Sequence, residues 1–255
     1  MYKKFRGVRG GFAIPIKSEV DIQRRYYGST ATQYEEMHGG AAEENRLALG
    51  LLSSAIDLLA VTSVLEVGAG TGRAIRRLKE AKPGLGLVGL EPSADLRRQG
   101  YDTGLSPDEL IEGDAQQLPF DNGSFDIVFE LAALHHMPRP DKAVAEMLRV
   151  ARVAIFISDS NNFGQGGYAA RRIKQLINAL GLWRAFDLMR TRGRGYHWSE
   201  GDGLYYSYSV FNDLPIIRQH CATVHVMNTA GASVNHYRDA PSVAVLGIKK
   251  SANPA

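Results

Sequence analysis

The chain has 255 residues, of which 44% are hydrophobic and 22% are charged, close to the average of globular proteins. This length suits one large α/β domain or two small ones, and the composition excludes a disordered chain, a collagen and a coiled coil. Lys and Arg number 30, and Asp and Glu number 27. The net charge of +3 is too small to indicate a nucleic-acid partner, which needs a clustered basic face.

The cysteine content and the apolar pattern bear on the compartment. Cys221 is the only cysteine in the sequence, which excludes an intramolecular disulfide and a metal site of several thiolates. The basic start of the chain lacks the apolar segment of a signal peptide, and no stretch approaches the roughly 18 apolar residues that span a bilayer. We therefore expect a cytoplasmic protein without a membrane partner. The sequence leaves the choice between a monomer and a homodimer open.

The first predicted elements lead up to a buried strand. Residues 1–29 are basic and interrupted by glycines, without a clear period, and we expect them to form an irregular N-terminal arm. Residues 30–38 and 43–60 are predicted to be helical, the second segment because its leucines and isoleucines recur at helical spacing. The apolar run 64–67 predicts a buried strand that ends in a glycine-rich turn.

Strands then alternate with helices along the chain. Strands are predicted at 85–90, 125–131 and 153–158, and helices are predicted at 93–99 and 142–150. This alternation is typical of βαβ units, and hence of a parallel sheet covered by helices on both faces. The chain closes with a helix and two strands, at 210–220, 223–229 and 242–248.

The segment 160–208 interrupts the alternation. It is too long for an ordinary connection between a strand and a helix, which takes about two to six residues. Its amphipathic helix places four apolar residues on one face and ends at Gly181: Ile173, Leu176, Ile177 and Leu180. An insertion at the carboxyl edge of a doubly wound sheet is a suitable position for a substrate-binding lid.

A glycine-rich turn, Glu66-Val-Gly-Ala-Gly-Thr-Gly72, follows the first predicted strand. A dinucleotide-binding turn would place its third glycine at position 73, which is Arg73 here. The turn instead resembles motif I of the class I S-adenosylmethionine-dependent methyltransferases of the small-molecule type. The resemblance extends over roughly residues 30–160, through Glu91, Asp114-Ala115, and the run 125–131 with the loop Ala133-Leu-His-His-Met-Pro138.

The resemblance implies a fold and a cofactor. The fold is a Rossmann-like, doubly wound and mostly parallel seven-stranded sheet, with an antiparallel last strand and a helical lid insertion after the fifth strand. Residues 30–255 would form the methyltransferase domain, with 160–208 as its lid. The cofactor is S-adenosylmethionine, which becomes S-adenosylhomocysteine. We expect no metal, because Glu130 and Asp159 lack a convincing further ligand.

The resemblance also suggests the cofactor-binding residues. Glu91 would accept hydrogen bonds from the two ribose hydroxyls, because a carboxylate can accept both. Asp114 and Ala115 would meet the adenine, unless Asp114 only caps the next turn. Tyr34 would fold over the cofactor, unless it packs within a helix. Glu66 would face the ammonium group of the methionine half, and the remaining predicted contacts are Gly68, Ala69, Gly70, Gly72, Pro92 and Leu131.

Two histidines follow the fourth predicted strand, where the methyl group would lie. Methyl transfer from a sulfonium needs an oriented acceptor and, for a hydroxyl acceptor, a base that removes its proton. His135 and His136 are the candidate catalytic residues, because histidine titrates near neutral pH. The resemblance at Met137-Pro138 favours His136 as the base, and the alternative is that both histidines order the loop.

The candidate substrate-binding residues follow the fifth predicted strand. Asp159, Asn161 and Asn162 could bind a polyol or a sugar, although Ser and Asn clusters also form turns. The lid adds side chains that suit a sugar or a ring-bearing metabolite: His197, Trp198, Glu200 and Tyr205. Residues 1–25 and 160–208 carry net charges of +5 and +4, against −8 for 26–159. An acceptor that bears phosphate or carboxylate is therefore an option.

The sequence thus predicts an enzyme that O-methylates a small hydroxylated metabolite, such as a sugar or a natural product. N- or C-methylation is the alternative within the family, because no residue discriminates between these reactions. An NAD-dependent oxidoreductase is the alternative from another class, and Arg73 disfavours it. A non-catalytic cofactor-binding subunit is a third hypothesis, which the complete set of motifs disfavours.

Overall fold

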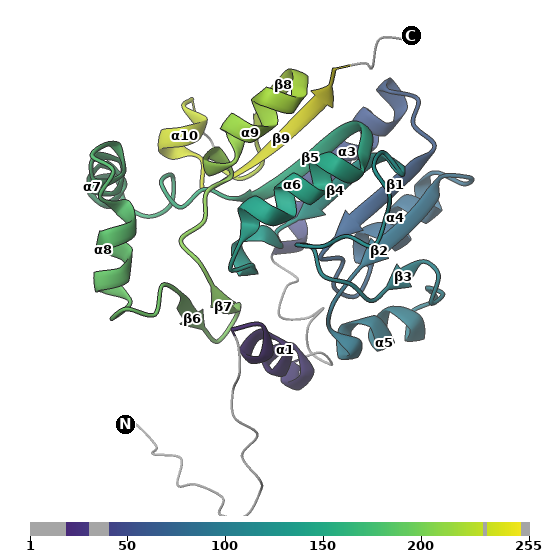
Figure 1. Cartoon of the computed structure of the whole chain (residues 1–255), viewed down its shortest axis with the longest axis horizontal. Helices are drawn as coiled ribbons and strands as arrows, with labels where there is room; N and C mark the ends of the chain where they lie inside the picture. The colour runs from purple at the N-terminus through teal and green to yellow at the C-terminus, as the bar shows by residue number, and fades with distance from the viewer. Residues whose placement is uncertain (1–18, 31–40, 232–233, 251–255) are drawn as a thin grey trace, which may run out of the picture.

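The computed structural model describes residues 19–30, 41–231 and 234–250. A seven-stranded sheet lies at the centre of the molecule (Figure 1). The order across the sheet is β3 (Leu110–Ile111), β2 (Gly86–Leu90), β1 (Ser63–Val67), β4 (Phe125–Leu131), β5 (Ala151–Ser160), β9 (Ser242–Lys249) and β8 (Cys221–Asn228).

The strand directions confirm the predicted fold class. The five strands from β3 to β5 pair in parallel, with Val64 of β1 between Leu87 of β2 and Ile127 of β4. β9 is antiparallel to both of its neighbours, β5 and β8. The chain reverses its strand order between β1 and β4, and the carboxyl ends beside this switch point are where ligands bind in such sheets.

Helices cover both faces of the sheet. The helices and 3-10 turns are α1 (Glu19–Thr30), α3 (Ala41–Leu58), α4 (Arg73–Ala81), α5 (Ala94–Asp102), η2 (Leu134–His136), α6 (Pro140–Val150), α7 (Tyr168–Ala179), α8 (Trp183–Arg190), η3 (Val210–Asn212), α9 (Leu214–His220) and α10 (His236–Asp239). Leu52 of α3 and Ile75 of α4 join the core on one face, and Met147 of α6 and Ile217 of α9 join the core on the other. Burying each of these side chains stabilises the fold by about 1.5–3 kcal/mol.

The prediction of an irregular arm is wrong for residues 19–29, which form α1 together with Thr30. This helix packs against α5 and against the lid strand β7 (Gly203–Tyr205), and Gln23 and Tyr26 are buried there. Contacts distant in sequence therefore stabilise a helix whose own sequence has a weak apolar period. The predicted helix 30–38 and the candidate Tyr34 lie outside the described residues, apart from Thr30 at the end of α1.

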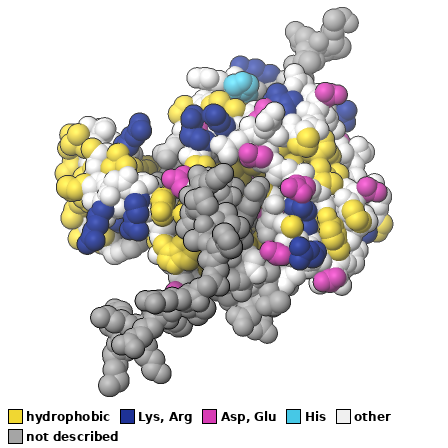
Figure 2. Space-filling view, turned by 60° about the horizontal axis from the view of Figure 1, so that its bottom comes forward, with side chains coloured by type: hydrophobic (Ala, Val, Ile, Leu, Met, Phe, Trp, Pro, Cys, Tyr) yellow, Lys and Arg dark blue, Asp and Glu magenta, His cyan; other side chains and the backbone are white. Residues whose placement is uncertain are grey.

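The insertion after β5 forms a lobe beside the sheet, made of α7 and α8 (Figure 1), followed by a small hairpin of β6 (His197–Ser199) and β7. The predicted amphipathic helix is present as α7, and Gly181 follows it at φ +72°. Its apolar residues are not packed in a core: Ile173, Leu176 and Leu180 are 57–63% exposed. Hydrophobic, Lys and Arg side chains cover the lobe in Figure 2. Among the helices of the described residues, none is long and apolar enough to cross a membrane.

Candidate functional site

Three cavities lie near the carboxyl ends of the central strands, and the first of them shares lining residues with each of the other two. The histidine cavity, about 350 Å³, is lined by Glu66, Arg73, His135, His136 and Asp159 among others. The Glu91 cavity, about 160 Å³, contains Glu91, Pro92, Asp114, Ala115 and Met137. The lid cavity, about 660 Å³, lies between His135 and the helices α7 and α8. Gly68, Gly70 and Leu131 line both of the first two cavities, which therefore adjoin across the glycine-rich turn.

The glycine-rich turn brings the backbone close to the loop after β4. Gly68 has φ +74°, and a Cβ atom on it would lie 2.5 Å from the Cβ atom of Ala133. Only glycine fits this conformation and this approach without strain. Gly72, at φ +71°, faces Leu105 and lines neither cavity, so its contact supports packing of α4 rather than the predicted cofactor contact. Ala69 lines the histidine cavity.

Glu66 contributes a buried carboxyl group to the histidine cavity. Its Oε2 atom is buried without a hydrogen-bond partner, and the side chain belongs to the end of β1. Burial raises the pKa of Glu66 to about 8, although Arg73 nearby lowers it. An unpartnered buried carboxyl group is costly, and a cationic group of a ligand at this place would remove the cost.

The Glu91 carboxylate is held by the backbone at the end of β2. The N–H of Gly70 donates to Oε2 at 3.0 Å, and the N–H of Ser93 donates to Oε1 at 2.8 Å. Each carboxylate oxygen has more than one lone pair, so these contacts leave Glu91 able to accept hydroxyl groups. Asp114 also lines this cavity, and its Oδ1 accepts the N–H of Gln116 at 2.9 Å, so it caps a turn as well.

Helix α1 completes the Glu91 cavity with residues that the sequence analysis missed. Gln23 and Tyr27 line this cavity. The oxygen of Gln23 accepts the N–H of Leu204 at 2.7 Å, which ties α1 to the lid hairpin. The sequence carries no motif for these contacts, because they depend on how α1 packs on the lid.

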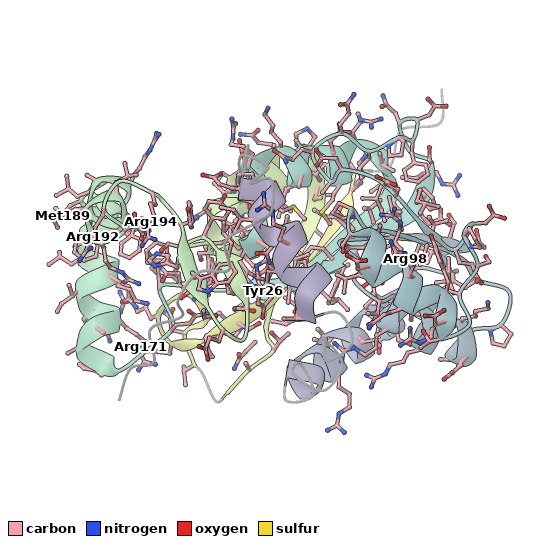
Figure 3. All side chains as sticks on the ribbon, turned by 90° about the horizontal axis from the view of Figure 1, so that it is seen from below. Tyr26, Arg98, Arg171, Met189, Arg192 and Arg194 are labelled. Carbon is pink, nitrogen blue, oxygen red and sulfur yellow. The ribbon has the colours of Figure 1, made fainter. Side chains whose placement is uncertain are left out.

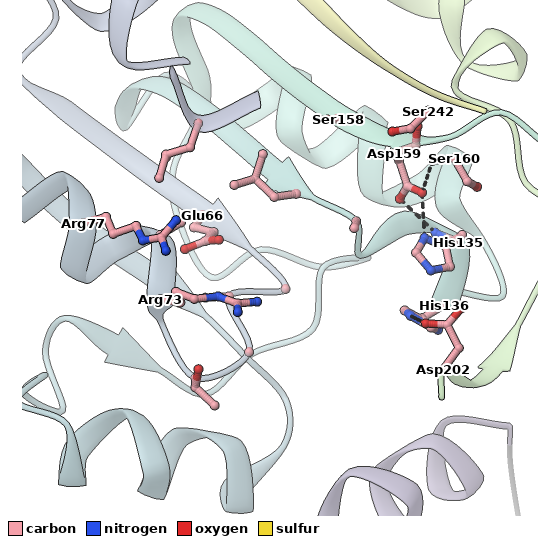
Figure 4. A pocket seen from close by; sticks show the side chains of 18 of the residues that line it. Glu66, Arg73, Arg77, His135, His136, Ser158, Asp159, Ser160, Asp202 and Ser242 are labelled. Carbon is pink, nitrogen blue, oxygen red and sulfur yellow. Dashed lines mark hydrogen bonds and ion pairs between the residues drawn. The ribbon is translucent and has the colours of Figure 1, made fainter. Parts of the chain in front are cut away.

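His135 and Asp159 form a buried pair between the ends of β4 and β5 (Figure 4). Nδ1 of His135 lies 2.6 Å from Oδ1 of Asp159, and the N–H of His135 donates to Oδ2 at 3.2 Å. Burial lowers the pKa of His135, but Asp159 raises it more, so the pKa ends above its ordinary value. Conversely, burial raises the pKa of Asp159, and His135 outweighs this and lowers it. Beside them, burial and Asp159 raise the pKa of Glu130, which favours its neutral form.

His136 is anchored differently from His135. Its Nδ1 lies 2.7 Å from the backbone oxygen of Leu204, and its Nε2 lies 3.8 Å from Oδ1 of Asp202. Burial and the neighbouring His135 lower the pKa of His136 to about 4. His136 is therefore neutral near pH 7, with Nδ1 donating to Leu204, and it is a weak base.

Some of the predicted substrate-binding residues line a cavity and others do not. Asn162, His197 and Tyr205 line the lid cavity, and Asp159 lines the histidine cavity. Asn161 lines none of the three cavities, which contradicts its predicted role: its amide group holds the backbone of 236–240 and Ser209. Trp198 and Glu200 also lie outside these cavities, against the prediction. Trp198 packs edge-on against Tyr26, and the backbone oxygen of Glu200 accepts the hydroxyl of Tyr26.

One side-chain group could accommodate a cation. His135, His136 and Asp202 each offer one atom, and these atoms lie within 4.8 Å of one another. No further described His, Cys, Asp or Glu joins this group. Three candidate ligands from two loops do not by themselves indicate a metal centre.

Comparisons with known proteins agree with this arrangement. A family model described as a methyltransferase domain matches residues 65–154. The chain is 38% identical over 103 residues to a demethylmenaquinone methyltransferase of Renibacterium salmoninarum, covering 40% of this chain and 42% of that protein. It is 32% identical over 134 residues to a phosphatidylethanolamine N-methyltransferase of Cereibacter sphaeroides, covering 50% and 66%. These alignments thus span about half the length of the relatives.

The whole fold has solved counterparts. Magnesium protoporphyrin IX methyltransferase of Synechocystis, solved with bound S-adenosylhomocysteine, superposes with a TM-score of 0.58 at 12% identity over 91% of this chain and 100% of that one. This likeness shows the fold. The fold, the motifs and the matched domain define an α/β methyltransferase architecture. The chain belongs to the class I S-adenosylmethionine-dependent methyltransferase family.

Proposed function

We propose that the protein transfers a methyl group from S-adenosylmethionine to a hydroxyl group of a small metabolite, such as a sugar or a natural product. The observation that carries this proposal is one cavity that holds both an unpartnered buried carboxyl group, Glu66, and a buried histidine–aspartate pair, His135 and Asp159. The first suits the cofactor, and the second suits a hydroxyl acceptor.

The residues present fit the cofactor. Glu66 would bind the ammonium group of the methionine half, because its Oε2 has no other partner. Glu91 would accept the ribose hydroxyls, and Asp114 with Ala115 would adjoin the adenine. When bound, S-adenosylmethionine supplies an activated methyl group on a sulfonium, so the protein needs to orient the acceptor and remove a proton.

His135 is the residue that we assign as the general base. Its Nδ1–H donates to Asp159, which leaves Nε2 as the proton acceptor. Asp159 keeps the ring oriented and stabilises the imidazolium that forms when the proton arrives. The sequence favoured His136, but its low pKa makes it a poor proton acceptor, and its contact with Leu204 suits a positioning role.

The reaction balances with these groups. The cofactor would supply the methyl group: the acceptor oxygen would gain a bond to the methyl carbon, and the bond from that carbon to sulfur would break to give a neutral thioether. His135 Nε2 takes the hydroxyl proton. A hydroxyl group needs such a base more than a neutral amine does, because an amine is already nucleophilic, and this supports O-methylation.

The test uses S-adenosylmethionine labelled in the methyl group and a panel of sugars, polyols and phenolic natural products. We expect label in an oxygen-bound methyl group of one acceptor class, with His135→Ala reducing turnover by about 10²–10⁴-fold. The affinity for S-adenosylhomocysteine, measured by calorimetry, should hardly change in this variant. Label only in nitrogen or carbon, or an unchanged rate in His135→Ala, would overturn the assignment.

A further inference from the structure

The end of the lid cavity that lies against α7 and α8 is positively charged. Lys174 of α7 and Arg190 of α8 line the cavity there. Asp202 is the only carboxylate among the described lining residues, and it acts on His135. The segment 168–194 carries seven basic residues and a single acidic one, Asp187. Asp187 is buried and bound by His197 and Ser207, and it does not line the lid cavity. Arg171, Arg192 and Arg194 lie on this same lobe in Figure 3.

Lys174 has no acidic partner among the described residues. Its Nζ atom donates to the backbone oxygen of Asn162, and no carboxylate of the described chain lies within 4.0 Å of it or of Arg190. Burial lowers the pKa of Lys174, and the positive charges of Arg190 and Arg171 lower it further. Like charges brought together in a partly buried place disfavour each other unless an anion joins them.

Asn162, which lines the same cavity, carries an unsatisfied donor. Its Nδ2 atom is buried and has no hydrogen-bond partner in the structure. Buried amide groups nearly always find an acceptor. Ser160, Tyr206 and Ser207 also line the cavity, but the hydroxyl groups of Tyr206 and Ser207 donate to Glu19 and Asp187, so Asn162 is the polar side chain with a donor to spare.

We propose that the α7–α8 end of the lid cavity, around Lys174, Arg190 and Asn162, binds a carboxylate or phosphate group of the methyl acceptor. The substrate class is then an anionic hydroxylated metabolite, such as a sugar phosphate or a sugar acid. This inference rests on the proposed function for its link to methyl transfer.

The position of the site agrees with that link. His135 lines both the histidine cavity and the lid cavity, so a molecule anchored at Lys174 and Arg190 extends toward the base. The aromatic side chains of Phe186 and Tyr205 also line the lid cavity, and they suit stacking against a ring of the acceptor. An arginine fork can bind both oxygens of an anion, and the lysine adds a compact charge.

The full chain is first saturated with S-adenosylhomocysteine. Inorganic phosphate, and in a separate experiment acetate, is then titrated into it, and binding is measured by calorimetry. We expect wild type to bind at least one of the two, more weakly as salt increases. Lys174→Met and Arg190→Gln should each weaken this binding by about tenfold or more. Arg98→Gln is the matched control, because Arg98 is an exposed arginine on α5, and it should leave binding unchanged.

Binding of phosphate alone assigns a phosphate ester, and binding of both anions assigns a site that also accepts a carboxylate. The proposal is overturned if the wild type binds neither phosphate nor acetate. It is also overturned if Arg190→Gln binds these anions as tightly as the wild type does. Arg190 is exposed, so this variant keeps the test valid if Lys174→Met does not fold. Binding of S-adenosylhomocysteine is measured first: its failure would contradict the proposed function, whereas loss of anion binding alone contradicts only the charge site.

Discussion

Replacing Asp159 by asparagine removes one charge from the buried pair of His135 and Asp159 and keeps the size of the side chain. Nδ1 of His135 lies 2.6 Å from Oδ1 of Asp159, and the Asp159 side chain is fully buried. Burial alone would hold the pKa of His135 below its ordinary value of 6.5, and Asp159 reverses this. In Asp159→Asn the pKa of His135 should therefore fall from above to below its ordinary value.

The expected loss of turnover is about 10²–10⁴-fold, because His135 loses both its orientation and the charge that stabilises its imidazolium. The pair also stabilises the fold. The raised pKa of His135 contributes stability that is complete below pH 6.5 and lost as pH rises through that raised pKa. The lowered pKa of Asp159 contributes stability that is complete above pH 3.8 and lost as pH falls through that lowered pKa. The variant should thus be less stable by about 1–3 kcal/mol, with the largest difference between these two pH values.

The assay is a proton NMR titration of the histidine ring signals, with the His135 signal assigned by its absence in His135→Ala. Thermal unfolding of wild type and Asp159→Asn at several pH values gives the stability difference. Asp95→Asn is a suitable control, because the Asp95 side chain is 42% exposed on α5, where it pairs with Arg98, and it does not contribute to the pKa shift of His135. An unchanged pKa of His135 in Asp159→Asn, or an equal stability difference at every pH, would refute the reasoning.

Three further predictions concern Glu66, the glycine-rich turn and the absence of a metal requirement. Binding of S-adenosylhomocysteine at pH 7 should release about one proton from the wild type and fewer from Glu66→Gln. The pKa of Glu66 is about 8, so its carboxyl group is mostly protonated until it meets the ammonium group of the ligand and loses its proton. Calorimetry in buffers of different ionisation enthalpy measures the number of protons released. Gly68→Ala should destabilise the fold by about 1–3 kcal/mol in urea unfolding, whereas Gly167→Ala, which meets nothing within 4 Å, should not. Treatment with EDTA should leave turnover unchanged, and a loss that Zn²⁺ or Mg²⁺ restores would contradict the assignment of His135 as a metal-free base.

Local sequence patterns carry much of the fold. The predicted strand 125–131 matches β4 residue for residue, because five of its seven residues are apolar, as is typical of a buried parallel strand, with only Asp126 and Glu130 between them. The turn 66–72 is also recognisable in the sequence, because its three glycines adopt positive φ angles that other residues rarely take. The aromatic and basic content of 160–208 likewise indicates a distinct lid.

Contacts between distant segments determine the rest. Whether His135 or His136 meets a carboxylate depends on how the loop after β4 faces Asp159 at the end of β5, and both histidines have the same chemistry in the sequence. Asn161 and Asn162 are adjacent, yet one is consumed by backbone groups and the other has an unsatisfied donor. Alternating side chains of an extended segment point to opposite sides, so the register decides which of them reaches a cavity.

The sequence by itself therefore determined the family, the order of the motifs and the strand pattern, because each is encoded within a short run of residues. It also placed a basic and aromatic lid after the fifth strand. Only the tertiary structure decided that α1 covers the Glu91 cavity, that His135 is the histidine paired with Asp159, and that Lys174 and Arg190 meet in one cavity. These features arise from packing between residues far apart in the chain, and no local pattern records which faces will meet.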